Sequence, residues 1–216
     1  MTKSIILVGA GGHAVSCANV LVSLQYKIAA IVSPEPPASR KFLYYPHFRT
    51  IEEAASGEAS FFCLAIGHNH TRSNVAEQII EKYGKESLPP IIHPFAHIAE
   101  SAEVAPGAVV MPKAVIGAEV SIGLGCLVNT SASIDHESTM NEYSSLAPGV
   151  CTGGNILLGA RSAICLGAHI VNNISVGEDA VVGASSLVLR DVSALSVWYG
   201  SPARHIRQRI PSDQYM

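Results

Sequence analysis

The sequence has little charge and few aromatic side chains. Charged residues make up 14% of the 216 residues, and aromatic residues make up 6%. Disordered chains combine low hydrophobicity with high charge, and coiled coils are rich in Glu, Lys and Arg, so the composition excludes both classes. The net charge of -3 provides no basic surface for nucleic acid, and we expect no nucleic-acid partner.

Paired cysteines and a targeting segment are also missing. The five cysteines include no C-x-x-C pair, and an odd number of separate thiols is typical of a reducing compartment. The first apolar run is short and leads into glycines, which does not fit a signal peptide. Residues 143–160 carry no charge, but Pro148 and several glycines interrupt them, so we expect no membrane insertion. These features predict a cytoplasmic protein.

The aliphatic residues that dominate the chain follow two different periods, and the first belongs to residues 1–90. Residues 4–8, 27–32 and 60–66 are short apolar runs typical of buried parallel strands. Residues 11–24 and 74–83 have the apolar spacing of helices, and Gly84 ends the second one. This alternation predicts a small α/β domain of the Rossmann-like type.

The second predicted domain, residues 91–216, contains a long stretch with a period of six. From Ile98 to Val188 every sixth residue is apolar except Thr152, and a second register from Ala96 to Ser186 holds only small or β-branched residues. A period of six that continues over about ninety residues is the signature of a hexapeptide parallel β-helix. One hexapeptide cannot bury its apolar residues, but stacked repeats create a common core. The pattern predicts an all-β domain with a short C-terminal tail.

Five segments, in order along nearly the whole chain, resemble motifs of a bacterial family. The family comprises nucleotide-linked amino-sugar N-acetyltransferases and sialic-acid O-acetyltransferases. The resemblance implies a left-handed β-helix of triangular coils, a homotrimer, and acetyl-CoA bound between neighbouring β-helices. Three hexapeptides per coil give about five coils. The matching segments are Gly9-Ala10-Gly11-Gly12-His13-Ala14, Ala65-Ile66-Gly67-His68-Asn69, Ile91-Ile92-His93-Pro94-Phe95-Ala96, Asn129-Thr130-Ser131-Ala132-Ser133-Ile134-Asp135-His136-Glu137 and Gly200-Ser201-Pro202-Ala203-Arg204.

The glycine-rich segment after the first strand is the candidate phosphate-binding turn. It links a strand to a helix, where backbone N–H groups and the helix N-terminus attract anions. A nicotinamide dinucleotide is disfavoured, because Ser33-Pro34 stands where an acidic residue would hold the ribose. Related enzymes that bind UDP-sugars tend to carry acidic residues at that place. The sequence therefore does not identify the base of the nucleotide. Glycines used only for tight packing are the alternative. The predicted nucleotide-sugar contacts are Gly11, Gly12, His13, Ser33 and Gly67.

His136 is the candidate catalytic base. An amine or hydroxyl must lose a proton to act as a nucleophile, and histidine titrates near neutrality. His136 lies two residues past the inward-facing Ile134, which predicts an outward-facing side chain. The resemblance places the catalytic histidine in this motif and gives Glu137 the role of orienting it. Asp135 is the alternative orienting residue, and a surface histidine in a turn is the alternative interpretation.

The acetyl donor is assigned by resemblance to small residues along the repeats. The Gly154 N–H is a candidate donor to the thioester oxyanion. Turn formation and ladder packing are the alternative roles. A three-histidine zinc site is disfavoured, because the next histidine after His136 is His169, and we expect no metal. The predicted acetyl-CoA contacts are Ser145, Gly154, Leu166 and Ala184.

The sequence therefore predicts an acetyl-CoA-dependent N-acetyltransferase. Its acceptor is a nucleotide-linked amino-deoxy sugar of bacterial glycan biosynthesis, and His136 allows direct transfer without an acetyl-enzyme. An O-acetyltransferase of a sialic-acid-like sugar is the alternative enzyme. A non-catalytic sugar-nucleotide-binding scaffold is the alternative of another class.

Overall fold

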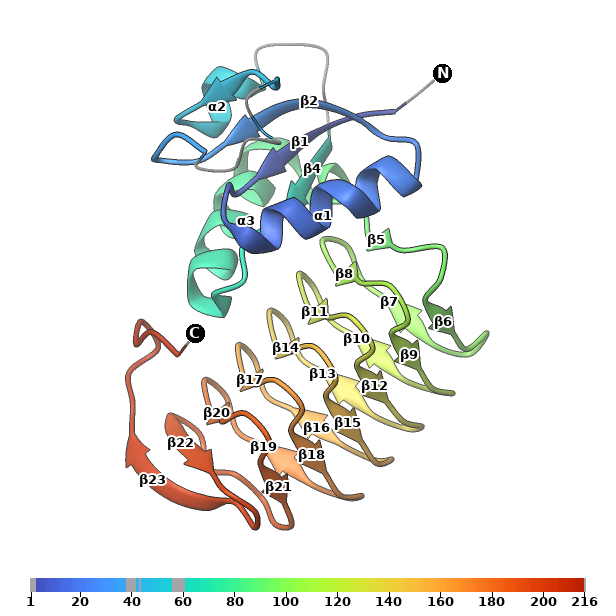
Figure 1. Cartoon of the computed structure of the whole chain (residues 1–216), viewed down its shortest axis with the longest axis vertical. Helices are drawn as coiled ribbons and strands as arrows, with labels where there is room; N and C mark the ends of the chain where they lie inside the picture. The colour runs from blue at the N-terminus through green and yellow to red at the C-terminus, as the bar shows by residue number, and fades with distance from the viewer. Residues whose placement is uncertain (1–2, 38–41, 43, 56–60, 216) are drawn as a thin grey trace.

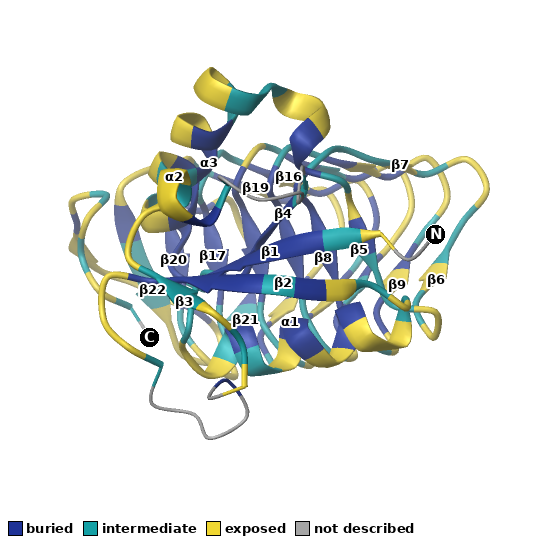
Figure 2. Cartoon of the chain, turned by 90° about the horizontal axis from the view of Figure 1, so that it is seen from above, coloured by how far each residue is buried: buried dark blue, intermediate teal, exposed yellow. Residues whose placement is uncertain are grey.

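A computed structural model describes residues 3–37, 42, 44–55 and 61–215 of the chain. The first part is a parallel sheet with the strand order β3-β2-β1-β4, flanked by helices (Figure 1). Seen from above, β1 and β2 are buried along most of their length (Figure 2). The elements are β1 (Ser4–Val8), α1 (Gly12–Ser23), β2 (Lys27–Val32), β3 (His47–Phe48), α2 (Ile51–Ala54), β4 (Phe61–Leu64), α3 (Asn69–Tyr83) and the 3-10 helix η2 (Lys85–Ser87).

The apolar runs predict β1 and β2 with their observed bounds, whereas α3 begins five residues earlier than the pattern indicates. The first turn of α3 is buried through polar residues, among them Asn69, Arg72 and Ser73. Apolar periodicity cannot detect such a turn. The His68 side chain caps it by accepting from the Thr71 N–H. The third predicted strand is shorter than expected, and its residue 60 lies outside the described residues.

The second part is a parallel β-helix of two-residue strands. Each strand pairs with the strand one coil later, as Ile122 does with Met140. The strands form three sheets, one of five strands, one of six and one that has eight strands when the two C-terminal strands of the chain are included. The strands are β5 (Ile91–Ile92), β6 (His97–Ile98), β7 (Glu103–Val104), β8 (Val109–Val110), β9 (Val115–Ile116), β10 (Ser121–Ile122), β11 (Leu127–Val128), β12 (Ser133–Ile134), β13 (Thr139–Met140), β14 (Ser145–Leu146), β15 (Cys151–Thr152), β16 (Leu157–Leu158), β17 (Ala163–Ile164), β18 (His169–Ile170), β19 (Ser175–Val176), β20 (Val181–Val182) and β21 (Leu187–Val188).

The core of the β-helix contains the two registers that the sequence predicts. The second residue of each strand points inward, and Ile116 and Leu146 are fully buried. Small residues of the other register, such as Ala132 and Ser138, are buried beside them. Thr152, the polar exception, is buried with no described hydrogen-bond partner for its hydroxyl. The spacing of six therefore reflects two inward ladders that stack from coil to coil.

The eight-stranded sheet carries the α/β part on its outward face (Figure 1). Outward residues Val109 and Leu127 belong to the same apolar cluster as α1, and Tyr143 belongs to the cluster of β4 and α3. The sheet ends in the antiparallel pair β22 (Ser196–Tyr199) and β23 (Arg204–Gln208). The β-helix begins with β5 at Ile91. We therefore propose that the boundary between the α/β domain and the β-helix domain follows residue 90.

Candidate active site

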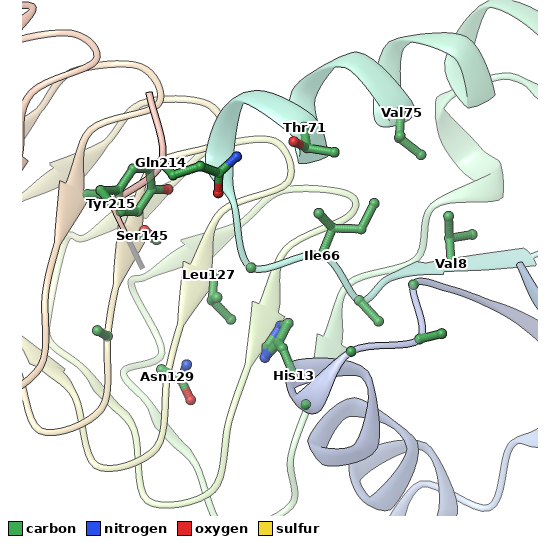
Figure 3. A pocket seen from close by; sticks show the side chains of 18 of the residues that line it. Val8, His13, Ile66, Thr71, Val75, Leu127, Asn129, Ser145, Gln214 and Tyr215 are labelled. Carbon is green, nitrogen blue, oxygen red and sulfur yellow. The ribbon is translucent and has the colours of Figure 1, made fainter. Parts of the chain in front are cut away.

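A cleft of about 1200 Å³ lies between the α/β part and the eight-stranded sheet. Figure 3 shows His13 and Ile66 on one side and Leu127, Asn129 and Ser145 on the other. The turn after β1 and the ends of β2 and β4 form the first wall, and outward residues of the sheet form the second. The cleft thus joins the two regions to which the sequence assigned separate ligands.

All five predicted nucleotide-sugar contacts line this cleft. Gly11 caps α1 without a side-chain hydrogen bond, and a Cβ added at Gly11 or Gly12 would meet no atom within 4 Å. Packing therefore does not require glycine at these two positions. Gly9 differs, since its Cβ would lie 2.4 Å from the Ala65 carbonyl oxygen. The N-terminal end of α1 is an open, positively polarised surface suited to phosphate.

The part of the cleft beyond β2 contains charged residues that the sequence pattern did not reveal. The Ser33 hydroxyl donates to the Glu35 carbonyl at 2.6 Å. Arg49 and Glu52 line the adjacent wall. Arg49 lies in the connection between β3 and α2, and Glu52 lies on α2, segments too short to show apolar periodicity. The sequence pattern alone therefore does not predict that Arg49 and Glu52 share a cleft with Ser33.

Three of the four predicted acetyl-CoA contacts line the same cleft. Ser145, Leu166 and Ala184 stand on its β-helix wall, while Gly154 lies outside it. Cys165 is also part of the wall, and burial raises the pKa of its thiol to about 11. Cys165 is therefore a neutral thiol near pH 7, which does not suit an acyl-accepting nucleophile.

His136 and Glu137 lie together at the corner between β12 and β13, outside the cleft of their own chain. The His136 Nδ1 is 2.8 Å from Glu137 Oε2, and both side chains are about half exposed. Glu137 has a φ of 53°, so it is not an extended neighbour pointing to the opposite face. Asp135 instead accepts the His136 backbone N–H at 2.8 Å. The carboxylate on the imidazole ring is that of Glu137.

The His136 ring lies against the α-carbon of Gly154 in the next coil. A Cβ at Gly154 would come within 2.5 Å of His136 Cε1 and 2.6 Å of Nε2. The neighbouring N–H groups of Gly153 and Asn155 donate to Ile170 and His136 carbonyls. No described hydrogen bond uses the Gly154 N–H. The structure thus gathers an imidazole, its carboxylate partner and a backbone N–H with no described acceptor at one corner.

Comparison with known proteins identifies relatives for both parts of the chain. Residues 4–79 match the PglD N-terminal domain family. A histidine-to-alanine mutant of GDP-perosamine N-acetyltransferase from Caulobacter crescentus, solved with CoA and GDP-perosamine, is 25% identical. It aligns over 96% of this chain and 99% of that chain, with a TM-score of 0.89. The acetyltransferase domain of PglB from Neisseria gonorrhoeae, solved with acetyl coenzyme A, is 27% identical over 95% and 100% of the two chains, with a TM-score of 0.85.

Curated relatives match shorter stretches. Serine acetyltransferase 2 from Arabidopsis thaliana is 39% identical over 120 residues, which are 54% of this chain and 32% of that protein. Chloramphenicol acetyltransferase from Agrobacterium fabrum is 35% identical over 72 residues, 33% of this chain and 34% of that protein. The chain thus spans about a third of the length of these curated relatives.

The structural matches confirm the predicted combination of an α/β part with a left-handed β-helix. None of the described helices has the length and apolar character needed to cross a bilayer. Residues 4–79 thus form a PglD-like N-terminal domain, and nearly the whole chain is similar in structure to nucleotide-sugar acetyltransferases of the hexapeptide-repeat type.

Proposed function

We propose that this protein transfers the acetyl group of acetyl-CoA to the amino group of a nucleotide-linked amino-deoxy sugar. The cleft carries this proposal, because its two walls unite the open phosphate turn at Gly11 and Gly12 with the predicted donor contacts Ser145, Leu166 and Ala184. The structurally similar Caulobacter enzyme was solved with CoA and GDP-perosamine, and the PglB domain with acetyl coenzyme A. A single cleft lined by the predicted contacts for both ligands supports a direct transfer between them.

In the proposed mechanism, His136 accepts a proton from the acceptor ammonium. The freed amine attacks the thioester carbonyl, and the Gly154 N–H stabilises the negative charge on its oxygen. Collapse breaks the carbon–sulfur bond, the His136 imidazolium protonates the departing CoA thiolate, and the acetylated nitrogen loses its second proton to solvent. The products are the N-acetylated sugar nucleotide and CoA. Glu137 holds the ring through Nδ1, which leaves Nε2 to exchange the proton.

We propose further that the site is completed in a homotrimer, with His136 of one subunit facing the cleft of its neighbour. Two observations support this arrangement. His136 does not line the cleft of its own chain. The corner that carries it also exposes Val171 and Leu189 at 38% and 51%, and the flanking sheets expose Val115 and Leu157. Exposed apolar residues clustered on one edge are typical of a surface that a partner covers.

A substrate panel tests the reaction. The wild-type protein and His136→Ala are supplied with acetyl-CoA and UDP-, dTDP- or GDP-linked amino-deoxy sugars, and thiol release is followed. We expect release with at least one amine and a hydroxylamine-stable product. A hydroxylamine-labile product from a hydroxylated sugar would identify the O-acetyltransferase. Binding of sugar nucleotide without any thiol release would identify the scaffold.

Subunit mixing tests the shared site. His136→Ala retains the cleft, and Gly12→Trp fills the cleft but retains His136. If the site lies between subunits, mixed trimers regain activity that neither variant has alone. Failure of mixed trimers, verified by native mass spectrometry, to regain activity would contradict the intersubunit arrangement.

A further inference from the structure

The segment after β23 contributes residues to the lining of the cleft, and we call residues 209–215 the strap. Arg209 anchors its beginning, since its side chain is 6% exposed and donates to the carbonyl oxygens of Asp179 and Asp213. The Arg209 guanidinium also lies 5.5 Å from the centre of the Tyr215 ring. The strap is therefore fastened to a corner of the β-helix and folded back on itself.

The other end of the strap is fastened to the N-terminus of α3. The Tyr215 hydroxyl accepts the Asn69 backbone N–H at 2.8 Å. The His68 ring stacks 5.0 Å from the Tyr215 ring and its Nε2 donates to the Asp213 carbonyl at 3.2 Å. Residues 213 and 215 are thus each held by contacts from α3 or its cap.

The same helix turn is tied to the β-helix and to the predicted sugar site. Asn69 donates to the Ser162 carbonyl at 2.9 Å and accepts from Arg72 at 2.7 Å. The buried Arg72 donates to the Gly67 carbonyl at 3.0 Å and to the Tyr143 carbonyl at 2.8 Å. Tyr215, Asn69 and Arg72 therefore fix the strap, the Gly67 turn and the β-helix wall relative to one another.

Gln214 stands between the two anchored residues of the strap and lines the cleft. It is exposed, and no described hydrogen bond uses its carboxamide. Figure 3 shows this carboxamide turned into the cleft between Tyr215 and Thr71, on the side of the Ile66 turn. An amide offers two donors and an acceptor, which suits the hydroxyl and amino groups of a sugar.

We propose that Gln214 binds the acceptor sugar and that Tyr215 is a positioning residue that presents it. This inference rests on the proposed function for the identity of the ligand. The position of Gln214 beside the Ile66–Gly67 turn assigns it to the acceptor rather than to acetyl-CoA. The strap gives the acceptor pocket a wall that comes from neither the phosphate turn nor the repeats.

Titration calorimetry on the full chain tests this assignment apart from catalysis. UDP-, dTDP- and GDP-linked amino-deoxy sugars are titrated into the wild type, and the one that binds is used for all variants. We expect Gln214→Ala to weaken sugar binding roughly 3- to 10-fold, the effect of one lost hydrogen bond, with acetyl-CoA binding unchanged. Gln208→Ala, on exposed β23 outside the cleft, is the matched control and should bind like the wild type.

A double-mutant cycle tests the role of Tyr215. If Tyr215 acts by presenting Gln214, Tyr215→Phe weakens binding, and the double variant binds no more weakly than Gln214→Ala alone. Additive losses would overturn the positioning role, and weakened acetyl-CoA binding by Gln214→Ala would overturn the acceptor assignment. Absence of sugar binding by the wild type would also overturn it. Wild-type sugar binding without acetyl transfer would instead refute the proposed function and leave the Gln214 assignment to be decided by the Kd ratio.

Discussion

Replacing Gly154 by alanine tests whether the observed His136 geometry is the reactive one. The added Cβ would lie 2.5 Å from His136 Cε1, whereas carbon atoms in contact are about 3.5–4.0 Å apart. The ring must move by about 1 Å or more, which breaks its 2.8 Å contact with Glu137. A displacement of about 1 Å in an active site costs on the order of 100-fold in rate.

The same substitution should cost little stability. The His136 side chain is 52% exposed, so the ring can turn into solvent instead of straining the coil. We expect kcat for thiol release to fall roughly 100-fold and the free energy of unfolding to change by less than about 1 kcal/mol.

A double variant supplies the control. In a His136→Ala background the added Cβ has no ring to displace, so Gly154→Ala should have no further effect on the residual rate. Retention of kcat within about threefold in the single variant would refute the placement of the reactive ring over Gly154.

Three other predictions follow from the contacts of this site and its supports. Glu137→Gln should lower kcat about 10-fold or more, because Glu137 contacts the His136 ring. Asp135→Asn alters only a contact to the His136 backbone and should keep kcat within about threefold. Equal effects of the two variants on kcat would contradict the orienting role of Glu137. Arg72→Met should lower the free energy of unfolding in urea by about 3 kcal/mol or more, because buried carbonyl groups lose their donor, and a loss under about 1 kcal/mol would contradict this. Burial raises the pKa of Cys165 to about 11 and that of Tyr143 to about 12. As the pH rises, the unfolded chain therefore releases these protons before the folded chain does. The free energy of unfolding is then at its full value below about pH 8 and falls as the pH rises toward these raised pKa values. A urea midpoint that does not change between about pH 8 and pH 10.5 would contradict this prediction.

The sequence predicts the β-helix in detail because its fold is encoded by a local, repeated pattern. An inward-facing position recurs every six residues from Ile98 to Val188. Because the repeats stack on one another, each repeat shows the same apolar pattern as the repeats next to it. The strands β1 and β2 can also be predicted from the sequence, since parallel strands buried on both faces are continuous apolar runs.

The composition of the cleft could not be predicted in the same way. Arg49 and Glu52 reach it from short polar elements, and Gln214 reaches it from a strap that has no apolar period. Arg72 is an ordinary polar residue of a helix in the sequence, yet it is buried at the junction of both parts. These placements depend on contacts between distant segments, which a local pattern does not encode.

The choice between Asp135 and Glu137 also needed the backbone. In an extended strand, His136 and Glu137 would point to opposite faces. The left-handed φ of 53° at Glu137 turns its carboxylate back to the His136 ring, whereas the Asp135 carboxylate accepts the His136 backbone N–H.

Mass spectrometry of the acceptor product measures the central claim most directly. Wild-type protein is incubated with acetyl-CoA and the nucleotide-linked amino sugar that it binds, with His136→Ala in parallel. The account predicts a product that gains one acetyl group on nitrogen, stable to hydroxylamine, with CoA released in equal amount and the reaction strongly reduced by His136→Ala. An unmodified sugar nucleotide, or an equal yield from His136→Ala, would contradict it.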